Sequence, residues 1–204
     1  MKRIIGLTGG ISTGKTTVSN YLANTFQLPV LDADIYAREA VQPGSPILSK
    51  IAERYGSSVQ LPDGTLNRKH LGEIIFSHST ERQWLEEQIH PYVRDRFQSE
   101  LDPLVASTVI LVVPLLFEAG MTDLVTEIWV VSCSPELQLR RLMERDCLSL
   151  EKAQTRISSQ LPIQEKVARA NIVLDNSSTL EALLEQVNLA LELSKNNFDF
   201  GTNS

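Results

Sequence analysis

Short apolar runs alternate with longer amphipathic segments along much of this chain. Five runs of mostly β-branched and aliphatic residues have the length of buried strands. They cover residues 4–8, 30–31, 109–113, 127–131 and 172–174. Most segments between them carry apolar residues at helical spacing. This alternation predicts an α/β fold in three layers, with a five-stranded parallel sheet between two layers of helices.

Residues 36–104 follow a different pattern, in which helical spacing dominates and no strong strand signal occurs. A turn is expected at 62–64, and helices are expected near 71–76 and 81–101. We therefore expect a helical, substrate-binding insertion at 36–104 within a single domain. The core of that domain is expected to comprise residues 1–35, 105–145 and 163–204.

The stretch from Gly9 to Thr17 fits the phosphate-binding pattern G-x-x-x-x-G-K-[ST], between the first predicted strand and the first predicted helix. Glycines let backbone N–H groups turn inward around phosphate oxygens, and the helix N-terminus adds the positive end of its dipole. In this pattern Lys15 reaches the β- and γ-phosphates, and the Thr16 hydroxyl binds Mg²⁺. A glycine-rich turn without a ligand is the alternative. The residues expected to bind the nucleotide are Gly9, Ser12, Thr13, Gly14, Lys15, Thr16 and Thr17.

Two carboxylates, Asp32 and Asp34, follow the second predicted strand at its carboxyl end, where ligands bind in open α/β sheets. Arg38 shares a helical face with Asp34. Many phosphate-loop ATPases hold Mg²⁺ with an acid at the end of the third strand, but Pro114 and two leucines stand there. We therefore expect Asp32 or Asp34 to take this role. The alternative for both is a helix N-cap, a position that Asp favours.

Basic side chains gather in two predicted helical regions. In the insertion, Arg68, Lys69, His90 and Arg94 are candidates to line an anionic substrate, with a solvated helix surface as the alternative.

A second basic region follows the fourth strand, with Arg140, Arg141 and Arg145 on one predicted helix and Arg156 on the next. Arginine clusters suit a transferring phosphoryl group. We expect residues 146–162 to form a lid that closes over phosphates. The alternative is a helical hairpin with solvated arginines.

The composition is that of an ordinary globular protein, with 204 residues, 42% hydrophobic and 22% charged. A net charge of -6 argues against coating of nucleic acid, which needs a basic face. Two cysteines too far apart for C-x-x-C indicate reduced thiols in a cytoplasmic protein. The apolar run after Arg3 is too short for a signal peptide, and no run is long enough to span a membrane.

These motifs together resemble the dephospho-coenzyme A kinase family over nearly the whole chain. The resemblance rests on the order and spacing of Gly6–Ile11 with Gly14–Lys15, Asp32–Asp34 with Arg38, Leu66–Arg68, His90–Pro91, Val113–Leu116, Arg141–Asp146, Arg156, Gln160 and Asp175–Asn176. Departures are small. Ser12–Thr13 stands where the family usually has Gly-Ser, Thr16 replaces Ser, and Asn171 replaces a frequent Asp.

The resemblance implies an enzyme that uses ATP and Mg²⁺ to phosphorylate the ribose 3′-hydroxyl of dephospho-CoA, the last step of coenzyme A synthesis. We expect a monomer that binds neither nucleic acid nor a membrane. Lys15, Asp34 and Arg141 are then expected to be catalytic, with Asp34 as the base. Arg145 and Asn176 are expected to bind the nucleotide, and Thr16 and Asp32 the metal. The residues expected to contact the acceptor are Asp34, Arg38, Arg68, His90, Leu115 and Leu116.

Other functions share part of this pattern. A kinase for another small acceptor would keep the core and differ in residues 36–104. A switch GTPase should carry N-K-x-D, and D-x-x-G after the third strand, and neither occurs there. A pure nucleotide-binding module would need neither the two acids nor the arginine-rich lid.

Overall fold

The computed structural model describes the backbone of residues 2–200 and the side chains of 2–75 and 78–193. The chain divides into two compact units. The first, which we call the sheet unit, comprises residues 1–31 and 105–204, and the second, the helical unit, comprises residues 32–104. Each unit is described by itself.

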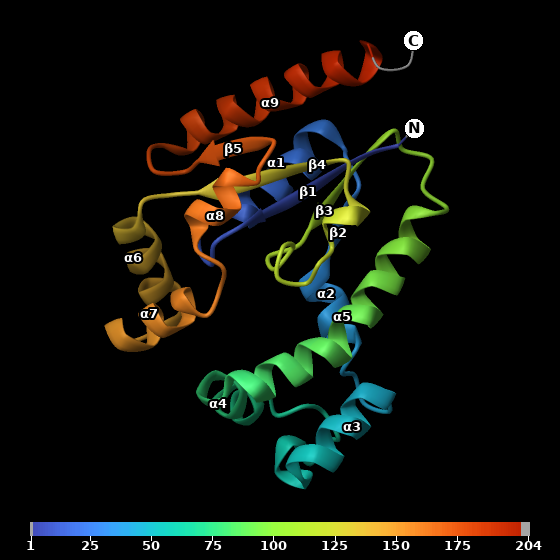
Figure 1. The fold of residues 1–204 in the computed structure, drawn as a ribbon, viewed down its shortest axis with the longest axis vertical. Helices are drawn as coiled ribbons and strands as arrows, with labels where there is room; N and C mark the ends of the chain where they lie inside the picture. Colours follow the sequence, from blue (N-terminus) through green and yellow to red (C-terminus); the bar gives the residue numbers. More distant parts are fainter. Residues whose placement is uncertain (1, 201–204) are drawn as a thin grey trace. The chain divides into compact units, whose positions relative to one another are not determined.

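Five strands form one sheet, in the order β2-β3-β1-β4-β5 (Figure 1). They are β1 (Arg3–Gly9), β2 (Val30–Asp32), β3 (Thr108–Val112), β4 (Glu127–Ser132) and β5 (Ile172–Asp175). The ladders of β1 with β3, β1 with β4 and β4 with β5 are parallel. The predicted α/β fold with a five-stranded parallel sheet is therefore confirmed.

One face of the sheet is covered by α1 (Lys15–Phe26) and α9 (Leu180–Phe200), whose buried residues form one core with alternate residues of the strands. The segment 114–126 packs against β1 from the other side. A Cβ on Gly6 would lie 2.9 Å from Val125 Cγ1 and 3.2 Å from Leu116 Cδ2. Glycine at this position therefore lets the segment that follows β3 approach β1 closely.

Three further α-helices and the single turn η2 (Thr122–Leu124) complete the described part of the sheet unit. After β4, α6 (Pro135–Asp146) and α7 (Leu150–Ser158) form a hairpin, and α8 (Ile163–Ala168) leads into β5 (Figure 1). The first residue before β5, Asn171, extends the β4–β5 ladder. Its N–H donates to Ile128 O at 2.9 Å, and its Oδ1 accepts from Ile128 N at 2.7 Å. An Asp oxygen would accept the same N–H, so this departure from the family pattern preserves the contact.

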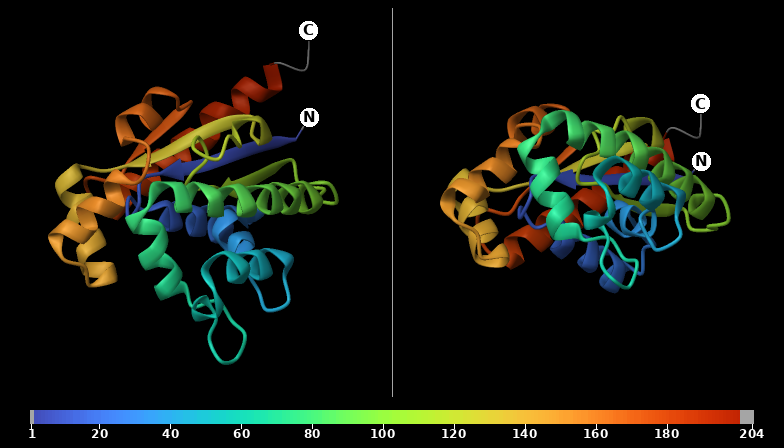
Figure 2. Two further views of the ribbon diagram at one scale, coloured as in Figure 1. Left: turned by 60° about the horizontal axis from the view of Figure 1, so that its bottom comes forward. Right: turned by 90° about the horizontal axis from the view of Figure 1, so that it is seen from below.

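The helical unit contains α2 (Ala33–Glu39), α3 (Pro46–Tyr55), the single turn η1 (Ser57–Val59), α4 (Arg68–Ser77) and α5 (Ser79–Leu101). Its core includes Leu48, Ile51, Val59 and Leu85. The predicted turn at 62–64 is confirmed, and it forms the tip of the teal loop between α3 and α4 (Figure 2). No helix of the described residues is long and apolar enough to cross a membrane.

Candidate active site

The phosphate loop, residues 9–14, joins β1 to α1, and its glycines are required by shape. Gly9 and Gly14 have φ values of 148° and 109°, which favour glycine. A Cβ on Gly9 would clash with the Val131 carbonyl oxygen, and one on Gly14 with the Asn176 amide. Glycine at both ends of the loop therefore lets the Val131 carbonyl and the Asn176 side chain pack closely against the loop backbone.

Lys15 begins α1 and turns back over the loop. Its Nζ donates to Gly10 O at 2.7 Å and to Gly9 O at 3.2 Å. Thr16 and Thr17 are exposed in the same turn, which contains no acidic residue. A helix N-terminus with a lysine and two hydroxyls and no carboxylate favours an anion.

Two residues expected to bind the nucleotide also support the loop itself. Thr13 is fully buried and its Oγ1 donates to Gly10 O at 2.9 Å. Asn176 is 8% exposed, and its Nδ2 donates to Thr13 O at 2.8 Å. Arg141 in turn donates from Nη1 to Asn176 O at 3.1 Å. Through these bonds α6 and the end of β5 hold the loop.

Ser12 and Ile11 form the apex of the loop. Ser12 has a φ of 59°, so this departure from the usual glycine places a side chain in the left-handed region. Both backbone polar groups of Ile11 are bound by glutamines. Its N–H donates to Gln160 Oε1 at 2.9 Å, and its carbonyl accepts from Gln138 Nε2 at 2.9 Å.

Two arginines of the α6–α7 hairpin share one carboxylate as their partner. Arg145 donates from Nε to Asp146 Oδ1 at 2.8 Å, and Arg156 from Nη1 to Asp146 Oδ2 at 2.6 Å. The hydrogen bond from Arg145 and the two nearby positive charges lower the pKa of Asp146. Arg141, four residues before Arg145, faces Asn176 instead. Of the two arginines expected to act on phosphates, Arg141 is therefore linked to the loop through Asn176, whereas Arg145 binds Asp146.

The end of β3, which lacks the expected acid, is bound by a buried lysine that sequence reasoning missed. Lys166 of α8 is fully buried, and its Nζ lies 2.8 Å from Glu118 Oε1 and 3.1 Å from Pro114 O. The Thr8 hydroxyl donates to the same Pro114 oxygen at 3.2 Å. Of the two leucines that follow, Leu115 is half-buried and Leu116 is fully buried.

The two acids that follow β2 differ in role. Asp32 is the N-cap of α2, and its Oδ1 accepts from Asp34 N at 2.8 Å. Partial burial raises the pKa of Asp32, and the Asp34 carboxylate also raises it. Asp34 is the second residue of α2 and is exposed, and the N-cap position is taken by Asp32, so capping does not explain Asp34. Asp32 is therefore the N-cap of α2, and Asp34 is not.

The helical unit also brings two predicted arginines into electrostatic range of each other. Arg38 is in the last turn of α2, and Arg68 is the first residue of α4. Burial lowers the pKa of the Arg68 guanidinium, and the positive charge of Arg38 lowers it further. Two like charges in this arrangement favour an anionic ligand. His90 of α5 is half-buried.

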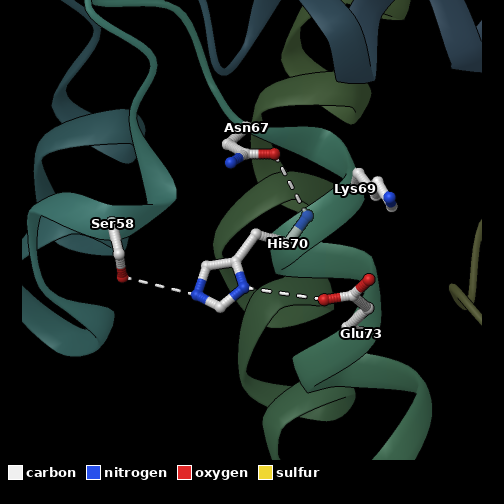
Figure 3. A pocket seen from close by; sticks show the side chains of 5 residues that line it. All are labelled: Ser58, Asn67, Lys69, His70 and Glu73. Atoms are coloured by element: carbon white, nitrogen blue, oxygen red, sulfur yellow. Dashed lines mark hydrogen bonds and ion pairs between the residues drawn. The ribbon is translucent and has the colours of Figure 1, made fainter.

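An open pocket of about 390 Å³ lies beside Arg68, lined by Ser58, Asn67, Lys69, His70 and Glu73 (Figure 3). His70 Nε2 lies 3.3 Å from Ser58 Oγ, and Nδ1 lies 3.7 Å from Glu73 Oε2. Lys69 points away from this chain of contacts (Figure 3). Of these residues, sequence analysis had named Lys69 as a candidate to line an anionic substrate.

A family model described as dephospho-CoA kinase matches residues 3–182. The chain belongs to the dephospho-CoA kinase family. The dephospho-CoA kinase of Trichormus variabilis is 63% identical over 190 residues, which cover 93% of this chain and 97% of that protein. That of Synechocystis sp. is 54% identical over 187 residues, covering 91% and 93%. A solved dephospho-CoA kinase from Campylobacter jejuni is 30% identical with a TM-score of 0.69, covering 97% of this chain and all of that one. The resemblance inferred from sequence motifs is confirmed.

Two of the residues that sequence reasoning missed, Gln138 and Lys166, are polar side chains at buried positions. Gln138 is buried one turn before the buried Leu142, so it is a polar residue on the apolar face of α6. Lys166 is likewise a fully buried charge on a short helix. Buried polar groups need partners, which makes such positions informative.

Proposed function

We propose that this chain transfers the γ-phosphoryl group of ATP to the ribose 3′-hydroxyl of dephospho-CoA, giving coenzyme A and ADP. Membership of the dephospho-CoA kinase family over residues 3–182 carries the proposal. In phosphoryl transfer the protein contributes mainly by positioning the two substrates and neutralising their charge. The chemistry of both units fits that demand.

The sheet unit would bind the donor. The loop amides and Lys15 would hold the β- and γ-phosphates, with Lys15 exchanging the Gly9 and Gly10 carbonyls for phosphate oxygens. Arg141, already hydrogen-bonded beside the loop, has further N–H groups for the charge that develops on the γ-phosphoryl. Arg145 would assist after leaving Asp146.

The residues present also fit Mg²⁺, which binds oxygen ligands and uses one or two protein groups beside substrate phosphates. Thr16 offers an exposed hydroxyl, and Asp32 a carboxylate. The raised pKa of Asp32 comes from burial and from Asp34, and a cation would offset both effects. The ion would neutralise charge on the β- and γ-phosphates.

The helical unit would bind the acceptor. No hydrogen bond joins the exposed Asp34 carboxylate to another described residue, so it is available to take the proton of the 3′-hydroxyl. The Arg38 and Arg68 charges suit the phosphates of dephospho-CoA, with His90 as a further contact. Of the two leucines that follow β3 in the sheet unit, Leu115 suits the apolar arm better than Leu116, which has no exposed surface.

The test is ATP turnover with dephospho-CoA, with no acceptor, and with other small hydroxyl acceptors. ADP formation that depends on dephospho-CoA, with phosphate found on the 3′-oxygen, supports the proposal. Faster turnover with another acceptor would identify a kinase of different specificity. Equal hydrolysis with and without any acceptor would indicate a nucleotide-dependent switch. Light scattering with and without substrates tests the expectation that the protein is a monomer.

A further inference from the structure

Two glutamines converge on one residue of the phosphate loop. Gln138 comes from the second turn of α6, and Gln160 follows α7. They bind the carbonyl and the N–H of Ile11 respectively. The two glutamines therefore fix both peptide planes of Ile11, the residue immediately before Ser12.

The backbone at Ser12 is strained and its side chain is poorly satisfied. A φ of 59° brings the Cβ of an L-residue close to its own backbone. The Ser12 hydroxyl oxygen is also buried without a hydrogen-bond partner among the described residues. Such a conformation persists only when the surrounding structure over-determines it. The bonds from Gln138 and Gln160 to the preceding residue provide that constraint.

Both glutamines are themselves held. Gln138 is 5% exposed, and Gly10 leaves room for it, because a Cβ there would lie 2.5 Å from Gln138 Nε2. Next to Gln160, Leu161 N donates to Glu118 Oε1 at 2.9 Å. The same carboxylate oxygen pairs with buried Lys166. Gln160 is therefore anchored, through its neighbour Leu161, to the segment after β3 at the point where the chain leaves the α6–α7 hairpin.

We propose that Gln138 and Gln160 are positioning residues that hold the phosphate loop in its strained, nucleotide-ready conformation. Because they stand near the beginning and just after the end of the α6–α7 hairpin, they link both ends of the hairpin to Ile11. This inference rests on the proposed use of the loop for ATP. It adds to that proposal the groups that keep the loop in shape before the nucleotide arrives.

The experiment compares Gln160→Leu, Gln138→Leu and a matched control, Gln154→Leu, which changes an exposed glutamine of α7. Binding of a non-hydrolysable ATP analogue with Mg²⁺ is measured by calorimetry. We expect about tenfold weaker binding for Gln160→Leu, because Ile11 N–H loses its partner. We expect a similar loss for Gln138→Leu and wild-type affinity for Gln154→Leu. The KM for dephospho-CoA should change less than twofold.

A double-mutant cycle with Ser12→Gly separates loop positioning from other roles of Gln160. Glycine adopts a φ of 59° without steric cost, so the loop needs less support. The effect of Gln160→Leu should therefore shrink to about twofold when both proteins carry Ser12→Gly. Gln138→Leu should behave in the same way, with thermal melting confirming that each variant folds.

Two results would overturn the inference. One is unchanged nucleotide binding by folded Gln160→Leu and Gln138→Leu proteins. The other is an effect of Gln160→Leu that is as large with Gly at position 12 as with Ser, since the glutamine would then act on something other than the loop conformation. Failure of the unsubstituted chain to bind the ATP analogue would instead overturn the proposed function, together with this inference.

Discussion

The phosphate loop and the candidate acceptor groups of the helical unit are organised in opposite ways. In the loop, carbonyls of four of its six residues accept hydrogen bonds from side chains, those of Lys15, Thr13, Gln138 and Asn176. In the helical unit, Asp34 is exposed, and Arg38 raises the electrostatic cost of the Arg68 charge. The phosphate loop, which would bind ATP, is thus held by hydrogen bonds within the protein. The residues of the helical unit that would bind dephospho-CoA instead carry charge that a ligand can neutralise.

This contrast predicts its largest effect at Lys15, the residue that changes partners when phosphate binds. Lys15→Ala should lower kcat by about 10³-fold, because the positive charge that would contact the transferring phosphoryl group is lost. The melting temperature should stay close to that of the unsubstituted chain. A coupled ADP assay measures the rate, with Lys152→Ala on the exposed face of α7 as the control. Near-normal turnover would refute the role of the loop in transfer.

Asp34 should produce the next largest effect. Asp34→Asn should lower kcat by about 10²-fold or more, the usual scale for general acid–base catalysis. Nucleotide binding and the melting temperature should be retained, because the cap belongs to Asp32.

Asp32→Asn is the matched variant, since Asn caps helices about as well as Asp. If Asp32 binds Mg²⁺, this change should lower the rate, and added Mg²⁺ should restore part of it. A folded Asp34→Asn protein with more than about a third of the unsubstituted kcat would exclude Asp34 as the base.

Lys166 should matter for stability rather than chemistry, because it joins α8 to the segment after β3. Lys166→Met should lower the free energy of unfolding by about 3 kcal/mol, since it leaves the Glu118 carboxylate without its cation. This lies at the low end for broken buried pairs because the Glu118 side chain is 21% exposed. Urea unfolding measures the loss. A cost below about 1 kcal/mol, as expected for an exposed lysine, would contradict the assigned role.

Arg68 should show the smallest effect. Unlike Lys166, it should matter for substrate binding rather than for stability. Arg68→Ala should raise the KM for dephospho-CoA about tenfold, the loss expected for one charged hydrogen bond. The KM for ATP should change less than twofold. Stability should hold or rise slightly, because repulsion by Arg38 disappears. Lys50→Ala, at an exposed lysine of α3, is the control. Equal increases in both KM values would count against an acceptor role for the helical unit.

The strands, the phosphate loop and the family can all be predicted from the amino-acid sequence. These depend on local rules, because a buried strand needs an apolar run and a phosphate loop needs glycines and a lysine at fixed spacing. The nine residues from Gly9 to Thr17 contain all of the information that the loop pattern requires. Family motifs extended the same reasoning to Asp34, Arg68 and Arg141, whose roles stay predictions.

The tertiary structure alone decided which side chains hold that loop. Gln138 lies 127 residues from Ile11, and Asn176 lies 163 residues from Thr13. No spacing rule connects such positions, because they are brought together by the sheet order β1-β4-β5 and by the helix α6 that follows β4. It also decided that Asp32 caps α2, which depends on the residue where β2 ends and the helix begins. Buried polar groups must find partners within reach, and only the packed chain determines which partners are near.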